Sequence, residues 1–378
     1  MSLGKKSLIL VLFLLAAFAG TWTPVWPQAP PPKYAYVANF NDNTVSGYLR
    51  DATTGALMAV PGSPFATGNG PAAVTVDVTG SCVFVVNFIS NNISAYKITP
   101  TTGALTQVSG SPFAAGTGPL GISVDVFSEL VYVANALSND VSAYTTLITT
   151  CALTPVSGSP FSDPGVSAPA SVVVDQTASF VYVANEFSNN VSGFAITIAG
   201  NFGGLTRISG SPWLAGSWPI SVVAVPLSTV HFIYVSNDGS NNVSGYSYSL
   251  STGALTPVPG TNPIPAGACP GLATIAPGGR QLYVPNFSDN TISGFNIATT
   301  CIPGPCDGAM TPVTGSPFRA GSGPTSVAVE PLGHFAYVTN ALANDIFEYN
   351  INGTNGALTV SGAPFSAGGF AIFVFFTP

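Results

Sequence analysis

Short apolar runs separated by turn residues follow one another from Tyr34 to the end of the chain. In one stretch, residues 73–77 and 93–98 alternate between apolar and polar side chains, whereas residues 82–87 are almost continuously apolar. A period of two is typical of a strand with one buried face, and a short continuous apolar run suits a strand buried on both faces. Clusters of Gly, Ser, Asn and Pro between the runs predict hairpin turns. No segment keeps a 3.6-residue apolar period over three turns, so we predict an antiparallel all-β protein.

One strand-like tetrapeptide recurs along the chain and ends each time in Asn. Its seven copies lie 48, 48, 50, 52, 49 and 54 residues apart and end at Asn39, Asn87, Asn135, Asn185, Asn237, Asn286 and Asn340. Four strands in a repeat of about 50 residues are typical of one blade of a β-propeller. The sequence therefore predicts a seven-bladed β-propeller of four-stranded antiparallel blades.

The two ends of the repeat region predict how the ring closes. The first Asn-terminated strand lacks the strand that precedes it in every other repeat, and residues 370–376 form an extra one at the C-terminus. We expect residues 370–376 to pair with residues 34–39 and so to complete blade one. This pairing removes two open sheet edges, whereas an unpaired tail would leave four aromatic side chains in water.

The first 33 residues have a different pattern. Lys5 and Lys6 precede a 12-residue apolar run at residues 8–19, and Ala17-Phe18-Ala19 provides the small residues of a cleavage site. This arrangement predicts a signal peptide at residues 1–19, followed by a Pro-rich tether at 20–33 and the propeller at 34–378. We therefore expect a secreted or periplasmic, or cell-surface, protein. An uncleaved anchor remains the alternative, although a membrane-spanning helix needs about 20 apolar residues.

Charge is scarce, which narrows the range of partners. Only 6% of the residues are charged and 46% are hydrophobic, whereas an average domain is about 25% charged. Eight Lys and Arg residues in 378 cannot form the basic surface that nucleic-acid binding requires. We expect no nucleic-acid partner, and no membrane span once the signal peptide is cleaved.

The repeat resembles the YVTN family of propeller repeats, because Tyr337-Val338-Thr339-Asn340 matches its name-giving motif. At this level the sequence is also similar to the lactonase-type seven-bladed propellers, which include 6-phosphogluconolactonases. The resemblance covers residues 34–376. It implies a propeller fold and, as an activity, hydrolysis of a sugar lactone; the motif itself consists of strand and turn residues and names no catalytic group.

Several repeated or unusual residues are candidates for chemistry. Equivalent positions after the innermost strand carry Asp77, Asp125, Asp175 and Glu330. These carboxylates either hold a hard cation or accept hydrogen bonds from the Ser/Thr-Gly turn that follows, and the turn is the more frequent role.

The five cysteines lie beyond the predicted signal peptide. Cys301 and Cys306 end a six-residue insertion in a hairpin turn, and an oxidising compartment favours a disulfide between them. Metal ligation by these two thiols is the weaker alternative. We interpret Cys82 as an apolar filler of a buried strand. The pairing of Cys82, Cys151 and Cys269 stays open.

The face formed by the inter-blade loops and the hairpins after each Asn is the expected ligand-binding face. Its unusual residues are our candidate ligand contacts: Glu186, Trp213, Trp218, Asp238 and Arg319. Trp213 also suits a packing role, because it replaces the Phe of a repeated Ser-Pro-Phe. The inner strands, read by alternation, offer no acid-base pair, and no motif indicates a metal or a cofactor.

From these residues we favour an exported, monomeric scaffold that binds a protein or a cell-surface carbohydrate at the channel-mouth face without catalysis. The alternative, which the family resemblance implies, is a lactonase-like hydrolase acting on a sugar lactone.

Overall fold

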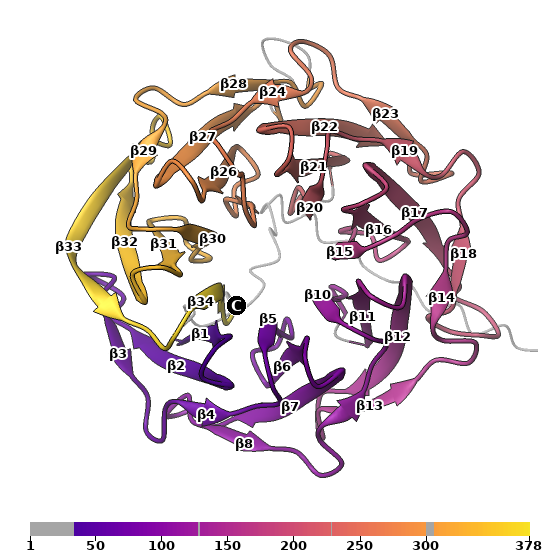
Figure 1. The fold of residues 1–378 in the computed structure, drawn as a ribbon, viewed down its shortest axis with the longest axis horizontal. Coiled ribbons are helices and arrows are strands. Elements are labelled where there is room, and N and C mark those ends of the chain that lie inside the picture. The colour runs from indigo at the N-terminus through magenta and orange to yellow at the C-terminus, as the bar shows by residue number, and fades with distance from the viewer. Residues whose placement is uncertain (1–33, 128, 228, 300–305) are drawn as a thin grey trace, which may run out of the picture. The chain divides into compact units, whose positions relative to one another are not determined.

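A computed structural model describes residues 34–378 except residues 128, 228 and 300–305. The predicted signal peptide and tether, and Cys301 of the predicted Cys301–Cys306 pair, lie outside the described residues. Within the described ranges the chain contains strands and turns and no helix, and so no helix that could cross a membrane. The strands form seven antiparallel sheets arranged in a ring (Figure 1). The predicted seven-bladed propeller is confirmed.

The first four blades are given from the inner strand outward, with the short fifth strand last. Blade 1 contains β34 (Ala371–Phe376), β1 (Tyr34–Asn39), β2 (Thr44–Arg50), β3 (Leu57–Ala59) and β4 (Phe65–Ala66). Blade 2 contains β5 (Pro71–Val76), β6 (Cys82–Asn87), β7 (Asn92–Ile98), β8 (Leu105–Gln107) and β9 (Phe113–Ala114). Blade 3 contains β10 (Pro119–Val124), β11 (Leu130–Asn135), β12 (Asp140–Leu147), β13 (Ala152–Pro155) and β14 (Phe161–Ser162). Blade 4 contains β15 (Pro169–Val174), β16 (Phe180–Asn185), β17 (Asn190–Ile196), β18 (Leu205–Arg207) and β19 (Trp213–Leu214).

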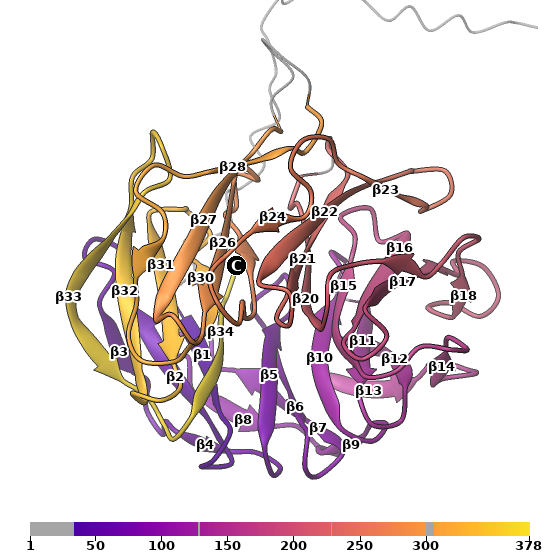
Figure 2. The ribbon, with the colours of Figure 1, turned by 45° about the horizontal axis from the view of Figure 1, so that its top comes forward.

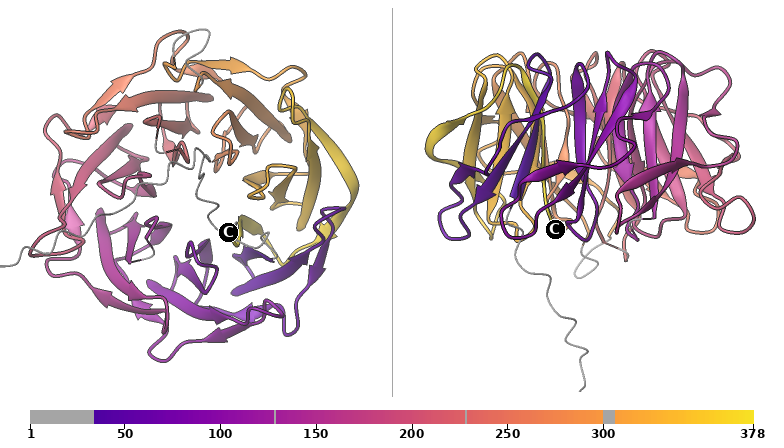
Figure 3. Two further views of the ribbon diagram at one scale, coloured as in Figure 1. Left: turned by 180° about the vertical axis from the view of Figure 1, so that it is seen from behind. Right: turned by 90° about the horizontal axis from the view of Figure 1, so that it is seen from below.

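The last three blades follow the same order. Blade 5 contains β20 (Pro219–Ala224), β21 (Phe232–Asn237), β22 (Asn242–Tyr248), β23 (Leu255–Pro257) and β24 (Ile264–Pro265). Blade 6 contains β25 (Thr274–Ile275), β26 (Gln281–Asn286), β27 (Thr291–Ile297), β28 (Met310–Pro312) and β29 (Phe318–Arg319). Blade 7 contains β30 (Pro324–Val329), β31 (Phe335–Asn340), β32 (Asp345–Ile351) and β33 (Leu358–Ser366). Figure 2 shows the inner strands standing around the centre of the ring, and the side view in Figure 3 shows the blades side by side at one height.

The C-terminal strand closes the ring as predicted. β34 pairs antiparallel with β1, and Val37 lies opposite Val374. The backbone N–H of Thr377 donates to the carbonyl of Tyr34 at 2.9 Å. Blade 1 therefore contains strands from both ends of the described chain. β1 is paired on both sides, and β34 is the innermost strand of the sheet.

A repeated tyrosine joins six of the seven blades to the blade that follows. In six blades the Tyr of the second strand donates a hydrogen bond of 2.6–3.0 Å from its hydroxyl to the carbonyl of a turn glycine in the following blade. The pairs are Tyr36–Gly103, Tyr132–Gly203, Tyr182–Gly253, Tyr234–Gly308, Tyr283–Gly356 and Tyr337–Gly55. These glycines have positive φ. A Cβ on Gly103 would lie 2.4 Å from the ring of Tyr34, so a side chain is excluded there.

Blade 2 departs from this series and corrects our interpretation of Cys82. Phe84 replaces the tyrosine and has no hydroxyl to donate, and Cys151 replaces the turn glycine of blade 3. Cys82 and Cys151 form a disulfide with their Cα atoms 5.6 Å apart. Cys82 stands where other blades carry a bulky residue such as Tyr34 or Leu130. Its small side chain leaves room for the Cys151 side chain, so both cysteines are structural partners rather than apolar filler.

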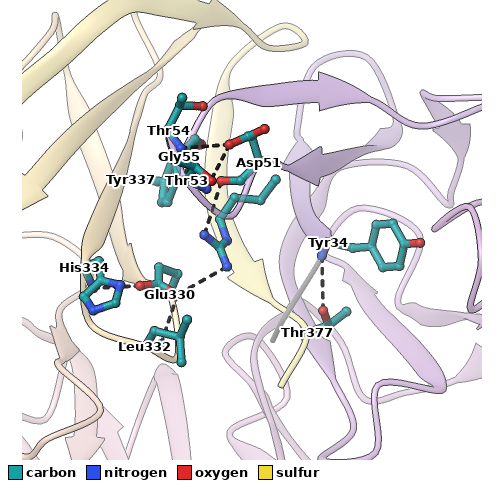
Figure 4. Close-up of polar contacts among 11 residues, drawn as sticks. Tyr34, Asp51, Thr53, Thr54, Gly55, Glu330, Leu332, His334, Tyr337 and Thr377 are labelled. Carbon is teal, nitrogen blue, oxygen red and sulfur yellow. Dashed lines mark hydrogen bonds and ion pairs between the residues drawn. The ribbon is translucent and has the colours of Figure 1, made fainter. Parts of the chain in front are cut away.

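The seam between blades 7 and 1 contains a buried ion pair (Figure 4). Arg50 Nη2 lies 3.6 Å from Glu330 Oε2, and the two side chains are 1% and 0% exposed. Glu330 also accepts hydrogen bonds from the backbone N–H groups of Leu332 and His334. Burial raises the pKa of the neighbouring Glu348 carboxyl above its usual value, and Arg50 partly offsets that rise.

The carboxylates at the ends of the inner strands hold turns. Asp77 Oδ1 accepts hydrogen bonds from the N–H groups of Ser81 and Cys82 at 2.7 and 2.6 Å. Asp175 makes the equivalent bonds to Ser179 and Phe180 at 2.8 and 2.7 Å. Within the part of the chain that the structure describes, no group of three metal-ligating side chains is present. The turn interpretation of these residues is confirmed.

Candidate functional site

In six of the seven blades, a β-bulge at the start of the inner strand points one side chain towards the centre of the ring. In blades 2, 3, 4, 5 and 7 the pairing register shifts between the inner-strand Pro and the second residue after it. In blade 1 the shift falls between Ala38 and Asn39. A bulge leaves one residue unpaired and turns its side chain away from the alternating pattern. The bulged residues are Ala72, Leu120, Ala170, Ile220, Thr325 and Ile372, and all of them line one central cavity.

Blade 6 forms a different wall of this cavity. Its inner strand is reduced to β25, and Leu272 instead makes an isolated parallel bridge with Ser326 of blade 7. A Cβ on Gly271 would lie 2.6 Å from the carbonyl oxygen of Thr325, so this close approach requires glycine. The break places Cys269, Gly271 and Leu272 in the cavity lining.

A second layer of side chains comes from the residue after each repeated Asn. This layer includes Phe40, Glu186, Asp238 and Phe287, all of which line the cavity. The backbone fixes them in the same way: the N–H of Glu186 donates to the carbonyl of Ala168, and that of Asp238 donates to the carbonyl of Trp218, both at 2.8 Å. The two carboxyl side chains come from the adjacent blades 4 and 5.

Each of these acceptor residues has a left-handed conformation that an Asn side chain stabilises. The N–H of Ala168, which has φ of 53°, donates to Asn139 Oδ1 at 2.8 Å. The N–H of Trp218, which has φ of 52°, donates to Asn189 Oδ1 at 2.9 Å. The Asn residues of the tight hairpins, themselves at positive φ, therefore position the loops at the mouth, in agreement with the predicted turn role of Asn.

The cavity has a volume of about 410 Å³ and opens on the face formed by the inter-blade loops and the hairpins after the repeated Asn. Its lining is mainly apolar, and its polar side chains are Glu186, Asp238, Cys269 and Thr325. This size and composition are typical of a small-molecule site, in which a few polar groups orient a ligand inside an apolar wall.

The two carboxyl groups have perturbed acidities. Burial, and then repulsion from Asp238, raise the pKa of Glu186 above its usual value. Burial also raises the pKa of Asp238, and a hydrogen bond from the Cys269 side chain partly lowers it again. Repulsion from an ionised Asp238 therefore disfavours ionisation of Glu186, whereas the Cys269 hydrogen bond favours the ionised form of Asp238. Such a pair can act as a general acid and a general base on one ligand.

The structure brings together two of the five residues that we predicted as ligand contacts. Glu186 and Asp238 line the cavity. Trp218 lies in the loop beside Asp238 and is 52% exposed, at the mouth but outside the lining. Trp213 packs in the core shared by blades 4 and 5, which agrees with its alternative role as a replacement for Phe.

Arg319 lies outside the cavity. It is exposed on β29, an outer strand of blade 6, and its carbonyl accepts a 2.9 Å hydrogen bond from the Tyr349 hydroxyl. Strict alternation along the inner strands would turn residues such as Ala73 and Gly121 towards the centre. The bulge moves the residue at the mouth by one position, to Ala72 and Leu120. The Pro that opens these strands was the available signal, but it does not specify a bulge.

Comparisons with known proteins agree with this architecture. The family model described as "Lactonase, 7-bladed beta-propeller" matches residues 29–168, 74–270 and 164–304. A candidate 6-phosphogluconolactonase from Bacteroides fragilis is 17% identical in sequence, with a TM-score of 0.77 over 93% of this chain and 99% of that chain. A periplasmic gluconolactonase from Pseudomonas aeruginosa is also 17% identical, with a TM-score of 0.76 over 92% of this chain and 99% of that chain.

No curated protein sequence matches the chain. At 17% identity the two solved structures show a shared fold. The family model, in contrast, matches more than half of the chain directly. The chain belongs to the seven-bladed β-propeller lactonase family.

Proposed function

We propose that the central cavity hydrolyses a lactone, with Asp238 as the general base and Glu186 as the general acid. The observation that carries the proposal is the pair of carboxyl groups with raised pKa values in one apolar cavity. Membership of the lactonase family and the gluconolactonase-like neighbours support this activity over the non-catalytic scaffold. The scaffold remains the competing hypothesis.

The chemistry needs one ionised and one protonated carboxyl group. The Asp238 carboxylate accepts a proton from water while the water oxygen forms a bond to the lactone carbonyl carbon. The ring C–O bond of the tetrahedral intermediate then breaks, and the ring oxygen takes the proton of Glu186. The product is a hydroxy acid, and at this stage Asp238 is protonated and Glu186 is ionised. Transfer of that proton from Asp238 to Glu186 restores the starting state.

Three features of the site favour this division of roles. The Cys269 hydrogen bond stabilises the charged form of Asp238. Repulsion from Asp238 stabilises the protonated form of Glu186. The apolar lining strengthens both effects, because charges interact more strongly where water is excluded.

Titration of released acid at constant pH tests the proposal, with δ-gluconolactone and δ-valerolactone as substrates. We expect Glu186→Gln and Asp238→Asn each to lower kcat at least 100-fold, as is usual for loss of a general acid or base. Asp42→Asn is the matched control, because Asp42 is an exposed carboxylate of a blade 1 hairpin on the same face, outside the cavity lining.

The pH profile gives a second test. After subtraction of the uncatalysed rate, turnover should fall as the pH rises through the raised pKa of Glu186, because its proton is lost. Turnover should also fall as the pH drops through the pKa of Asp238, because the base becomes protonated. Full activity in either carboxyl variant would refute the roles proposed for Glu186 and Asp238. No turnover by the wild-type protein would refute the proposed activity and favour the scaffold.

A further inference from the structure

We propose that the substrate is a neutral lactone that carries a hydrocarbon chain, an inference that rests on the proposed lactone hydrolysis. The chain would occupy the apolar wall of the central cavity and extend across an apolar rim at its mouth. Three observations lead to this substrate class: the composition of the lining, the exposed side chains around the mouth, and the sign of the charge in the cavity.

The lining offers few partners to a polyhydroxylated ligand. Most of the side chains that face the cavity are hydrocarbon: Phe40, Ala72, Leu120, Ala170, Ile220, Leu272, Phe287 and Ile372. Of the polar side chains, Glu186 and Asp238 are committed to proton transfer, and the Cys269 side chain hydrogen-bonds to Asp238. The Thr325 hydroxyl already hydrogen-bonds with the hydroxyl of Thr339 at 3.0 Å. A sugar ring would therefore bury hydroxyl groups without partners, which is unfavourable, whereas an alkyl chain would not.

The surface around the mouth carries exposed apolar side chains that we call the apolar rim. It consists of Ile89, Leu137, Phe187, Trp218 and Leu342, which are 52–65% exposed. All five lie in the inter-blade loops or in the hairpins after the repeated Asn. Apolar side chains of similar exposure, such as Phe127, Leu147 and Ile198, also lie in or beside turns of the opposite face. The five residues of the rim differ from them because they surround the mouth of an apolar cavity, where exposed apolar surface marks a binding site.

The rim is continuous with the cavity. A Cβ placed on Gly70 would lie 2.8 Å from Ile89 of the rim and 3.2 Å from Phe40 of the lining. A Cβ on Gly323 would likewise lie 2.6 Å from Leu342 of the rim and 3.0 Å from Phe287 of the lining. One hydrocarbon chain can therefore pass from the lining to the rim without crossing a polar belt at these two points.

The charge in the cavity argues for a neutral ligand. In the proposed mechanism Asp238 is ionised, so the cavity carries a negative charge, and the apolar surroundings strengthen its repulsion of an anion. A phosphorylated or carboxylated lactone would be repelled, whereas a neutral alkyl lactone would not.

The test compares kcat/KM for δ-valerolactone, δ-octanolactone, δ-decanolactone and δ-gluconolactone with the full-length protein. Each methylene moved from water into an apolar site improves binding about fourfold. We expect kcat/KM to rise at least tenfold from δ-valerolactone to δ-decanolactone, and δ-gluconolactone to be the poorest substrate.

Two matched variants test whether the hydrocarbon chain of the substrate contacts the apolar rim. Leu342→Asn in the apolar rim should lower the ratio of kcat/KM for δ-decanolactone over δ-valerolactone about tenfold. Leu250→Asn is the control, because Leu250 is 53% exposed against 58% for Leu342 but lies in the turn between β22 and β23 on the opposite face. The control should leave the ratio unchanged.

A binding measurement separates the two levels of the proposal. The fluorescent apolar probe N-phenyl-1-naphthylamine should bind the wild-type protein and be displaced by δ-decanolactone but not by δ-gluconolactone. Hydrolysis that prefers δ-gluconolactone, or that ignores chain length, would overturn the substrate class and leave lactone hydrolysis standing. Displacement without any hydrolysis would overturn the proposed function and keep the apolar ligand class. The inference is overturned if δ-decanolactone displaces no probe and kcat/KM does not depend on chain length.

Discussion

The Cys82–Cys151 disulfide occupies the one place in the ring where the Tyr–Gly hydrogen bond between blades is missing. The two cysteines are 69 positions apart in the sequence. For a loop of this length the chain-entropy estimate of disulfide stabilisation is about 4 kcal/mol. A buried tyrosine hydrogen bond contributes about 1 kcal/mol. The covalent link should therefore stabilise this blade contact by more than the hydrogen bond found elsewhere.

Removal of the bridge alone gives the first measurement. Cys151→Ala eliminates the disulfide and keeps a Cβ at the same left-handed position, which has φ of 56°. We expect the free energy of unfolding in urea to fall by about 4 kcal/mol. Dithiothreitol should lower the midpoint of the wild-type protein more than that of this variant.

The second measurement uses variants in which the disulfide between blades 2 and 3 is replaced by the Tyr–Gly contact that joins blades 3 and 4. Cys82→Leu with Cys151→Gly reproduces Leu130 and Gly203, and Phe84→Tyr then adds the equivalent of the Tyr132 hydroxyl. Phe84 and Cys151 already lie in one core cluster, so the new hydroxyl should reach the carbonyl of residue 151. The triple variant should be about 1 kcal/mol more stable than the double variant.

Two results would refute the reasoning. If Phe84→Tyr destabilises the double variant, the hydroxyl has found no acceptor, and the two kinds of link are not equivalent. If Cys151→Ala unfolds at the wild-type urea midpoint, the disulfide contributes nothing that the surrounding packing does not already supply.

Three further predictions concern charge, closure and the tyrosine series. Glu348→Gln should raise the melting temperature at pH 8 and leave it unchanged at pH 3. Burial raises the pKa of Glu348 in the folded protein. A carboxyl group with a raised folded-state pKa lowers stability as the pH rises and the group ionises, and the variant removes this effect. Deletion of residues 371–378 should expose the edge of β1 and cause aggregation by light scattering, and a synthetic peptide of residues 366–378 should reverse it. Tyr234→Phe should lower the free energy of unfolding by about 1 kcal/mol, because the carbonyl of Gly308 loses its hydroxyl donor.

The repeat made most of the fold predictable. A strand period of two, turn residues at regular intervals and one surplus strand at the C-terminus were sufficient for seven blades closed by β34 and β1. The short fifth strands, such as β9 at Phe113–Ala114, were missed, because two-residue strands carry no alternation. The disulfide was missed because its partners lie in different blades, and sequence spacing alone does not determine which cysteines meet.

The candidate site was predictable only in part. Glu186 and Asp238 stood out because a charged residue follows the repeated Asn only in blades 4 and 5. The apolar lining was missed, because a bulge changes which side chain of an alternating strand faces the centre. Cys269 could not be placed, since its approach to Asp238 depends on the broken inner strand of blade 6.

A comparison of the blades with one another separates scaffold from site. The backbone hydrogen bonds at the mouth repeat in every blade, so packing requires nothing more of the residue after the Asn than a backbone N–H. Five of the seven blades have Ala or Phe there in place of a charge, namely Phe40, Phe88, Ala136, Phe287 and Ala341. Glu186 and Asp238 occupy the same backbone position in adjacent blades and are partly desolvated, which lowers stability instead of raising it. Because neither the repeat nor the packing accounts for two neighbouring carboxyl groups, the chemistry of the cavity is the simplest reason for their presence.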